Sequence, residues 1–186
     1  MGPDGFVEEL TWDGKTPEEP VLKETRTVKY TAFADGSRGI EIDSALTAAS
    51  GDAVFKCAPL TGNSVEAGLI ATRVSKEISS DPNKAIVSSA GVTGEKDSRD
   101  KPAAWCDYSG TIAGKIYGIA IVNSKENPGG DFPWHVRVQG LFAQIGPLEW
   151  TLKNGETATY KHLIIIHEGD AKTGNIADKA KAWRGE

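Results

Sequence analysis

Three polar side chains that could take part in binding or catalysis occupy alternate positions of the stretch FPWHVRVQGLF (132–142). If this stretch is one extended strand, His135, Arg137 and Gln139 share one face, at intervals of about 6.6 Å. The opposite face then packs into the core with Trp134, Val136, Val138 and Phe142. Imidazole titrates near neutral pH and can transfer protons. We therefore predict that the His135, Arg137 and Gln139 face is exposed and forms the floor of a binding site.

A second candidate lies in WCDYSG (105–110), where alternation puts Trp105, Asp107 and Ser109 on one side and Cys106 and Tyr108 on the other. The Trp105 ring could stack on a sugar while Asp107 accepts hydrogen bonds from hydroxyl groups. The same pattern is also that of ordinary sandwich packing.

Arg73 interrupts the apolar stretch GLIATRVS (68–75). An arginine that faces inward must be paired, because an unpaired buried charge costs several kcal/mol, on the order of the stability of a small domain. We predict that Arg73 is at least partly buried. Its partner is either the carboxylate of Asp107 or a hydroxyl or carboxylate of a ligand.

The histidines do not form a metal-binding pattern. His162 and His167 are five residues apart, so on a regular strand they point to opposite faces and cannot hold one metal together. His135 could meet one of them only through strand pairing, and we expect neither a metal nor another cofactor. His167 ends the apolar run LIII at the junction of a strand and a loop, a common place for ligand-contacting residues.

The common catalytic motifs are absent from the sequence, including G-x-S-x-G, the phosphate-binding loop, H-E-x-x-H and G-x-G-x-x-G. The composition is that of a globular protein, with 186 residues, 39% hydrophobic and 25% charged. The net charge is −5 and the basic residues are scattered, which argues against a nucleic-acid partner. No apolar run approaches the roughly 20 residues of a membrane helix, and no secretory signal is recognisable at the N-terminus. The cysteines, Cys57 and Cys106, could form one bridge or remain two buried thiols.

The elements that would position these residues are β-strands. Alternating or β-branched segments separated by Gly, Pro, Asn or Asp clusters predict an all-β fold, a mainly antiparallel β-sandwich in a single domain, 1–186. The expected strands are 21–33, 39–46, 53–57, 68–75, 84–90, 103–110, 115–122, 133–142, 148–152 and 158–167.

Three other segments depart from the strand pattern. Residues 1–20 are rich in Gly, Pro, Asp and Glu and are expected to form a loose lead-in, and 91–102 a long polar loop. Residues 174–185 carry Ala and Lys at helical density between Asn175 and Gly185, which predicts a short terminal helix. The first strand pair, 21–33 and 39–46, is expected to form a hairpin.

Four stretches in order, GLIATRVSKEI, WCDYSG, YGIAIVNSKENPGGDFPWHVRVQGLF and YKHLIIIHEGD, resemble the C-terminal part of a bacterial family labelled "methane oxygenase PmoA". The resemblance covers about residues 10–172. The label conflicts with the sequence, because a true methane oxygenase subunit is an integral membrane protein. The resemblance implies a β-sandwich related in shape to aldose-epimerase-like carbohydrate enzymes, with no settled reaction. It also allows a periplasmic or secreted location.

The residues matched by this resemblance are Arg73, Trp105, Asp107, Trp134, His135, Arg137 and His167. The chain lacks the HHRG-like segment with which the family usually begins, which suggests a truncated chain or an inactive binding remnant. We expect a protein that binds or acts on a sugar or modified glycoside, with His135 or His167 as acid/base in an epimerase, lyase or hydrolase reaction. Arg73, Arg137, Gln139, Trp105 and Asp107 would contact the sugar. A non-catalytic binding module and a copper or zinc enzyme are the alternatives, and the oligomeric state is left open.

Overall fold

The protein is described by a computed structural model that covers residues 4–16, 18–56, 59–60, 64–65, 68–146 and 149–186. Its strands are β1 (Gly5–Trp12), β2 (Leu22–Ala32), β3 (Arg38–Ala48), β4 (Ala53–Lys56), β5 (Pro59–Leu60), β6 (Ser64–Val65), β7 (Gly68–Arg73), β8 (Ala85–Ser88), β9 (Trp105–Ile112), β10 (Lys115–Asn123), β11 (Trp134–Val136), β12 (Leu141–Ile145), β13 (Glu149–Leu152) and β14 (Thr157–Glu168). Its helices are α1 (Lys76–Ser80), α2 (Gly94–Ser98) and α3 (Ile176–Arg184). The predicted all-β, antiparallel fold with a short C-terminal helix is confirmed.

A large antiparallel sheet organises the fold, with strand order β1-β2-β3-β14-β10-β9-β8. The predicted hairpin of β2 and β3 is confirmed, and Gly36 in its turn has a φ of 89°, which glycine adopts without strain. The prediction of a loose lead-in is wrong for β1, which pairs with β2 from Gly5↔Lys29 to Trp12↔Leu22. Although this segment is polar in composition, its Phe6, Leu10 and Trp12 side chains lie on one face of the strand.

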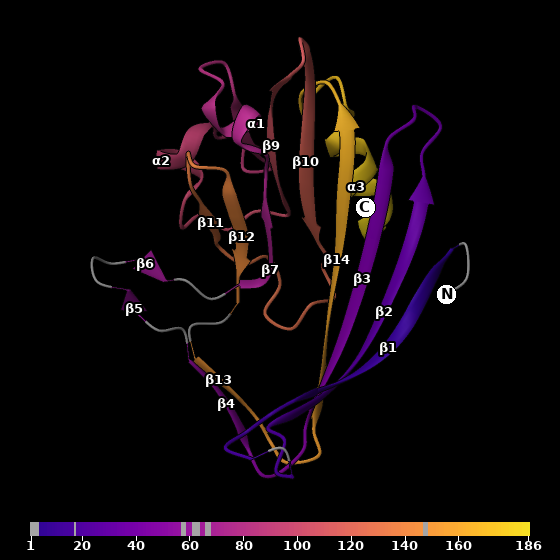
Figure 1. Cartoon of the computed structure of the whole chain (residues 1–186), viewed down its shortest axis with the longest axis vertical. Helices are drawn as coiled ribbons and strands as arrows, with labels where there is room; N and C mark the ends of the chain where they lie inside the picture. Colours follow the sequence, from indigo (N-terminus) through magenta and orange to yellow (C-terminus); the bar gives the residue numbers. More distant parts are fainter. Residues whose placement is uncertain (1–3, 17, 57–58, 61–63, 66–67, 147–148) are drawn as a thin grey trace.

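Two further layers cover opposite faces of the large sheet (Figure 1). A three-stranded sheet of order β11-β12-β7 packs Trp134, Val136 and Phe142 against Cys106 and Tyr108 of β9. On the other face, α3 packs Ile176 and Ala180 against β10 and β14. The large sheet therefore presents even-numbered residues of β9 to the small sheet, and odd-numbered residues to the helix side.

The stretch 133–142 is a hairpin, and the prediction of one strand is wrong. β11 ends at Val136, and Arg137 donates its backbone N–H to the carbonyl of Leu141 at 2.8 Å across a turn. Gly140 closes the turn with a φ of 95°, a conformation that favours glycine. Val138 is consequently exposed instead of packed in the core.

The remaining expectations differ in outcome. The terminal helix lies where it was predicted, with Asn175 and Gly185 at its caps, although the side chain of Asn175 makes no capping hydrogen bond. The short helices α1 and α2 were not predicted, and α2 lies inside the expected polar loop. Cys106 is a buried free thiol, and Cys57 lies outside the described residues.

Candidate functional site

A cleft of about 390 Å³ lies over the large sheet where it extends beyond the three-stranded sheet. Its floor comes from β1, β2, β3 and β14, and β4 and β7 supply its wall. Arg26, Ser44 and Tyr160 are register partners on three adjacent strands, so they lie side by side on this floor. The described residues that line the cleft are Trp12, Glu24, Arg26, Ile42, Ser44, Leu46, Phe55, Leu69, Ile70, Tyr160 and His162.

Glu24 is the buried anion of the cleft, with only 1% of its surface exposed. Its carboxylate accepts two hydrogen bonds from Arg26, at 2.8 and 3.0 Å, and one from the Trp12 indole at 2.9 Å. Burial alone would raise the pKa of Glu24, but hydrogen bonds from Arg26, Ser44 and Trp12 outweigh it and lower the pKa. Glu24 is therefore a fixed negative charge that holds Arg26 and Trp12 in place.

Arg26 connects this anion to a second one. Its guanidinium also donates to Glu8 on β1 at 3.1 Å. Hydrogen bonds and attraction to Glu24, together with Glu8, outweigh burial and raise the pKa of Arg26. Two carboxylates therefore surround one guanidinium, and this group of three has a net charge of −1.

His162 lies on the same floor and is almost fully buried. Its Nε2 is 2.7 Å from Oε1 of Gln144, a buried residue of β12. Burial lowers the pKa of His162 from 6.5 to about 4, so the ring is neutral at physiological pH. Among the described residues, the amide nitrogen of Gln144 has no partner, an arrangement that costs about 1–3 kcal/mol. The pair is therefore not optimised for stability alone.

Aromatic rings supply much of the apolar surface of the cleft. Phe55 stacks on Trp150 with centroids 3.9 Å apart, and Trp150 contacts Tyr160 edge to face at 5.7 Å. Phe55 and Tyr160 both line the cleft, and Trp12 borders it with about half of its surface exposed. The cleft thus combines rigid rings with fixed hydrogen-bonding groups.

The residues predicted from WCDYSG lie on the other side of the large sheet. As predicted, Trp105, Asp107 and Ser109 share a face, but this face is covered by α3 and the segment before it. Nε2 of His167 is 2.7 Å from the Asp107 carboxylate, and both side chains are buried. Burial raises the pKa of the Asp107 carboxyl group, which the hydrogen bond to His167 opposes.

Two glycines make room for His167. A Cβ atom at Gly118 would lie 2.5 Å from the His167 ring, and one at Gly174 would lie 2.5 Å from its Nδ1. The ring can therefore cross β10 to reach Asp107 on β9, and the segment containing Gly174 closes over it. The prediction that Arg73 is partly buried and paired with Asp107 is wrong. Arg73 is exposed at the end of β7, and the Asp107 carboxylate is hydrogen-bonded to His167.

Of the three residues expected to share the floor of a site, His135 and Arg137 contact each other, whereas Gln139 lies on the turn of the β11–β12 hairpin. His135 is buried, which corrects the expectation that it is exposed, and Gln139 is exposed on the turn. Arg137 donates from Nε to Nε2 of His135 at 3.2 Å and lies 3.6 Å from Glu95 on α2. His135 belongs to the small sheet and His167 to the α3 side of the large sheet, so the structure does not bring them together.

The cleft residues were missed because their sequence signals are short. Glu24 and Arg26 lie in the strand LKETRTVKYTA, whose many charged residues are typical of a solvent-exposed face. Two sequence features could have indicated the cleft. Trp12 alternates in phase with Phe6 and Leu10, which indicates a strand, and the odd spacing of His162 and His167 places them on opposite faces of theirs. It takes the pairing of four strands to gather these residues.

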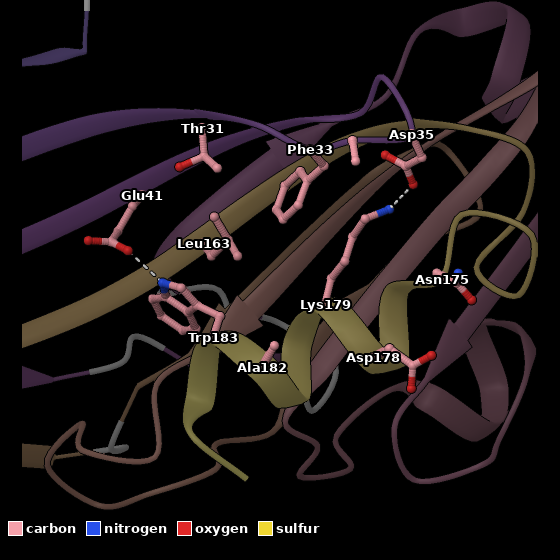
Figure 2. Close-up of a pocket in the computed structure, with 11 residues that line it drawn as sticks. Thr31, Phe33, Asp35, Glu41, Leu163, Asn175, Asp178, Lys179, Ala182 and Trp183 are labelled. Carbon is pink, nitrogen blue, oxygen red and sulfur yellow. Dashed lines mark hydrogen bonds and ion pairs between the residues drawn. The ribbon is translucent and has the colours of Figure 1, made fainter.

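A second, larger groove of about 560 Å³ runs between α3 and the β2–β3 side of the sheet (Figure 2). Its main polar groups already contact one another: Lys179 donates to Asp35, and the Trp183 indole donates to Glu41, each at 2.5 Å. The Lys179 ammonium also lies 5.2 Å from the centroid of the Phe33 ring. These contacts fasten α3 to the sheet, so the groove is best explained as the seam of that packing.

Two features are absent from the described residues. No group of three or more His, Cys, Asp or Glu side chains is arranged to hold a metal ion. No helix within those residues has the length and hydropathy needed to cross a membrane.

Comparison with known proteins places the chain in a family. Residues 2–181 match one described as "Family of unknown function (DUF6807)". The chain belongs to this family. Neither a curated protein nor a solved structure matches significantly. The family assignment covers nearly the whole chain, and the methane-oxygenase label suggested by the resemblance is not confirmed by these comparisons.

Proposed function

We propose that this protein binds a carbohydrate in the cleft between β1, β2, β3, β14 and β7. The observation that carries the proposal is the hydrogen-bonded cluster of the buried Glu24 with Arg26 and Trp12 on the floor of a cleft that also contains aromatic rings. Small-molecule binding sites are mostly apolar, with a few convergent polar groups that fix the orientation of the ligand.

A sugar ring suits this combination of surfaces. Its C–H faces can pack on the exposed part of Trp12 or on Tyr160, and its hydroxyl groups can both donate and accept hydrogen bonds. Arg26 is partly exposed and can donate, and Ser44 can accept, while the buried Glu24 holds Arg26 in place. The cleft volume of about 390 Å³ lies in the ordinary range for small-ligand sites and suits one or two sugar rings.

The geometry supports binding more directly than turnover. His162, whose pKa is lowered to about 4, is a weak base, and the carboxylate of Glu24 is already held as an anion by three neighbours. Acid/base catalysis by His135 or His167, and contact of the sugar with Arg73, Trp105, Asp107, Arg137 or Gln139, stay predictions that this cleft does not support.

The test is saturation-transfer difference NMR with glucose, galactose, mannose and their methyl glycosides. We expect transfer to at least one of these sugars, and a loss of at least tenfold in its affinity in Trp12→Ala. Trp183→Ala is the matched control, because Trp183 also donates to a glutamate but lies in the α3 groove. A thermal melt of each variant checks that it is folded.

Two outcomes would reject the proposal. One is the absence of saturation transfer to every sugar of the panel. The other is binding that survives Trp12→Ala and is lost in Trp183→Ala, which would move the site to the groove beside α3.

A further inference from the structure

The hydrogen bond between His162 and Gln144 determines which nitrogen of the imidazole carries the proton. Nε2 of His162 faces the carbonyl oxygen of the Gln144 side chain at 2.7 Å. A carbonyl oxygen only accepts hydrogen bonds, so Nε2 must carry the proton of the neutral ring. The lone pair of the imidazole is then on Nδ1.

Gln144 is well placed to hold this tautomer. It lies in β12, in register with Ile70 of β7, and it is fully buried. Its side-chain amide nitrogen has no partner among the described residues, so the hydrogen bond to His162 is the one that its side chain makes with them. An outer residue that fixes the tautomer of a histidine commonly decides which nitrogen meets a ligand.

We propose that His162 is a specificity-determining residue whose Nδ1 accepts a hydrogen bond from a hydroxyl group of a neutral sugar, in the Nε2–H tautomer fixed by Gln144. This inference rests on the proposed function of the cleft. It assigns the sugar a hydroxyl donor at this position and assigns Gln144 a positioning role.

The charges around His162 favour a neutral sugar over a sugar acid. The titratable side chains that share the cleft with it are Glu24, Arg26 and Tyr160. The other described neighbours are uncharged: Trp12 of β1, Ile42, Ser44 and Leu46 of β3, Phe55 of β4, Leu69 and Ile70 of β7, and Gln144 of β12. Arg26 is already shared by Glu24 and Glu8, and it is the one cationic side chain among the described residues that line the cleft, so a ligand carboxylate would meet net negative charge there.

The neutral state of His162 persists well below physiological pH, because burial lowers its pKa to about 4. The hydrogen bond from a sugar hydroxyl should therefore be available over the whole range from pH 8 to pH 5. An ordinary exposed imidazole would lose its acceptor near pH 6.5.

The experiment combines side-chain ¹⁵N NMR of histidine with affinity measurements on glucose, galactose, mannose and their uronic acids. In the free wild-type protein, His162 should show the Nε2–H tautomer. The affinity for the neutral sugar that binds best should be constant from pH 8 to pH 5, and at least tenfold higher than for the corresponding uronic acid.

Gln144→Glu is the decisive variant, because it keeps the side-chain shape and puts a carboxylate against Nε2. This carboxylate favours the imidazolium, in which both ring nitrogens are donors. We expect the affinity for the neutral sugar to fall at least tenfold at pH 6. Asn83→Asp, at an exposed turn, adds the same charge far from the cleft and should leave the affinity unchanged. His162→Phe, which keeps a ring without an acceptor, should also lose at least tenfold.

The outcomes separate this inference from the proposed function. An Nδ1–H tautomer, a fall in affinity between pH 7 and pH 6 in the wild type, or unchanged binding in both Gln144→Glu and His162→Phe would overturn the role of His162. If Trp12→Ala abolished sugar binding in the same series, the cleft would still be the sugar site. Absence of binding to every sugar in the wild type would overturn both.

Discussion

At the residue scale, burial decides the charge of His162 and thereby couples it to folding. The folded-state pKa is about 4, whereas an exposed histidine titrates near 6.5. Between these two values the unfolded chain takes up a proton that the folded protein does not. The folded state therefore loses stability as the pH falls through this window.

We expect His162 to contribute a loss of about 3 kcal/mol in the free energy of unfolding between pH 6.5 and pH 4. Urea denaturation at several pH values measures it, with His162→Gln as the comparison that cancels the contribution of the carboxyl groups. The pH dependence of the variant should be flatter in this window. Equal slopes in the two proteins would contradict the burial of a neutral His162.

The face of the strand on which a residue lies was predictable from alternation, but its contact partner was not. The shared face of Trp105, Asp107 and Ser109 follows from the two-residue repeat of a strand, and so does the burial of Trp134. The partner of Asp107 does not, because His167 is 60 residues away and reaches it only across Gly118. Strand order and register decide such contacts, and a single sequence does not specify them.

At the element scale, the β11–β12 hairpin separates a core residue from a surface residue within five positions. The Trp134 side chain is fully buried and its indole donates to the carbonyl of Ala103 at 2.9 Å. Val138, which would share its face on a continuous strand, is 44% exposed on the turn.

Trp134→Ala should therefore lower the free energy of unfolding by about 3–5 kcal/mol, as expected for the loss of a large buried ring. Val138→Ala should change it by no more than about 0.5 kcal/mol, as at other exposed positions. Chemical denaturation of the two variants gives both numbers. Similar losses in both would point to a continuous strand with Val138 in the core.

The positions of most elements were predictable, because strands and turns have local signals. The breaker-rich segments between strands and the Ala- and Lys-rich terminal helix are examples. β1 was missed because Glu8 and Glu9 interrupt its apolar alternation, and the turn at 137–140 was missed because its only strong turn residue is Gly140. The cleft needs β1, β2, β3 and β14 together, which is why the sequence alone did not reveal it.

At the scale of the whole molecule, β14 and β10 lie in the middle of the large sheet and β1 lies at one edge (Figure 1). The strand order places β8 at the other edge. Each central strand is paired on both sides, α3 packs on one face of both, and the small sheet covers part of the other face. Central strands that are buried on both faces open only when a large part of the structure unfolds.

Native-state hydrogen exchange should therefore be slowest in β10 and β14 and fastest in β1 and β8. Mass spectrometry of peptic fragments after graded labelling times measures this order. Protection of β1 equal to that of β14 would show that something other than β2 covers this edge.

The alternation of β14 has a consequence for protein engineering. Tyr160 and His162 face the cleft, whereas Leu163 and Ile165 belong to the core under α3. Alternate residues of one strand therefore contribute to two different surfaces. A library restricted to the cleft-facing positions could retarget recognition without disturbing the helix seam. Inserting one residue between them would exchange the two surfaces, so recombination breakpoints belong in the loops that flank β14 and not within it.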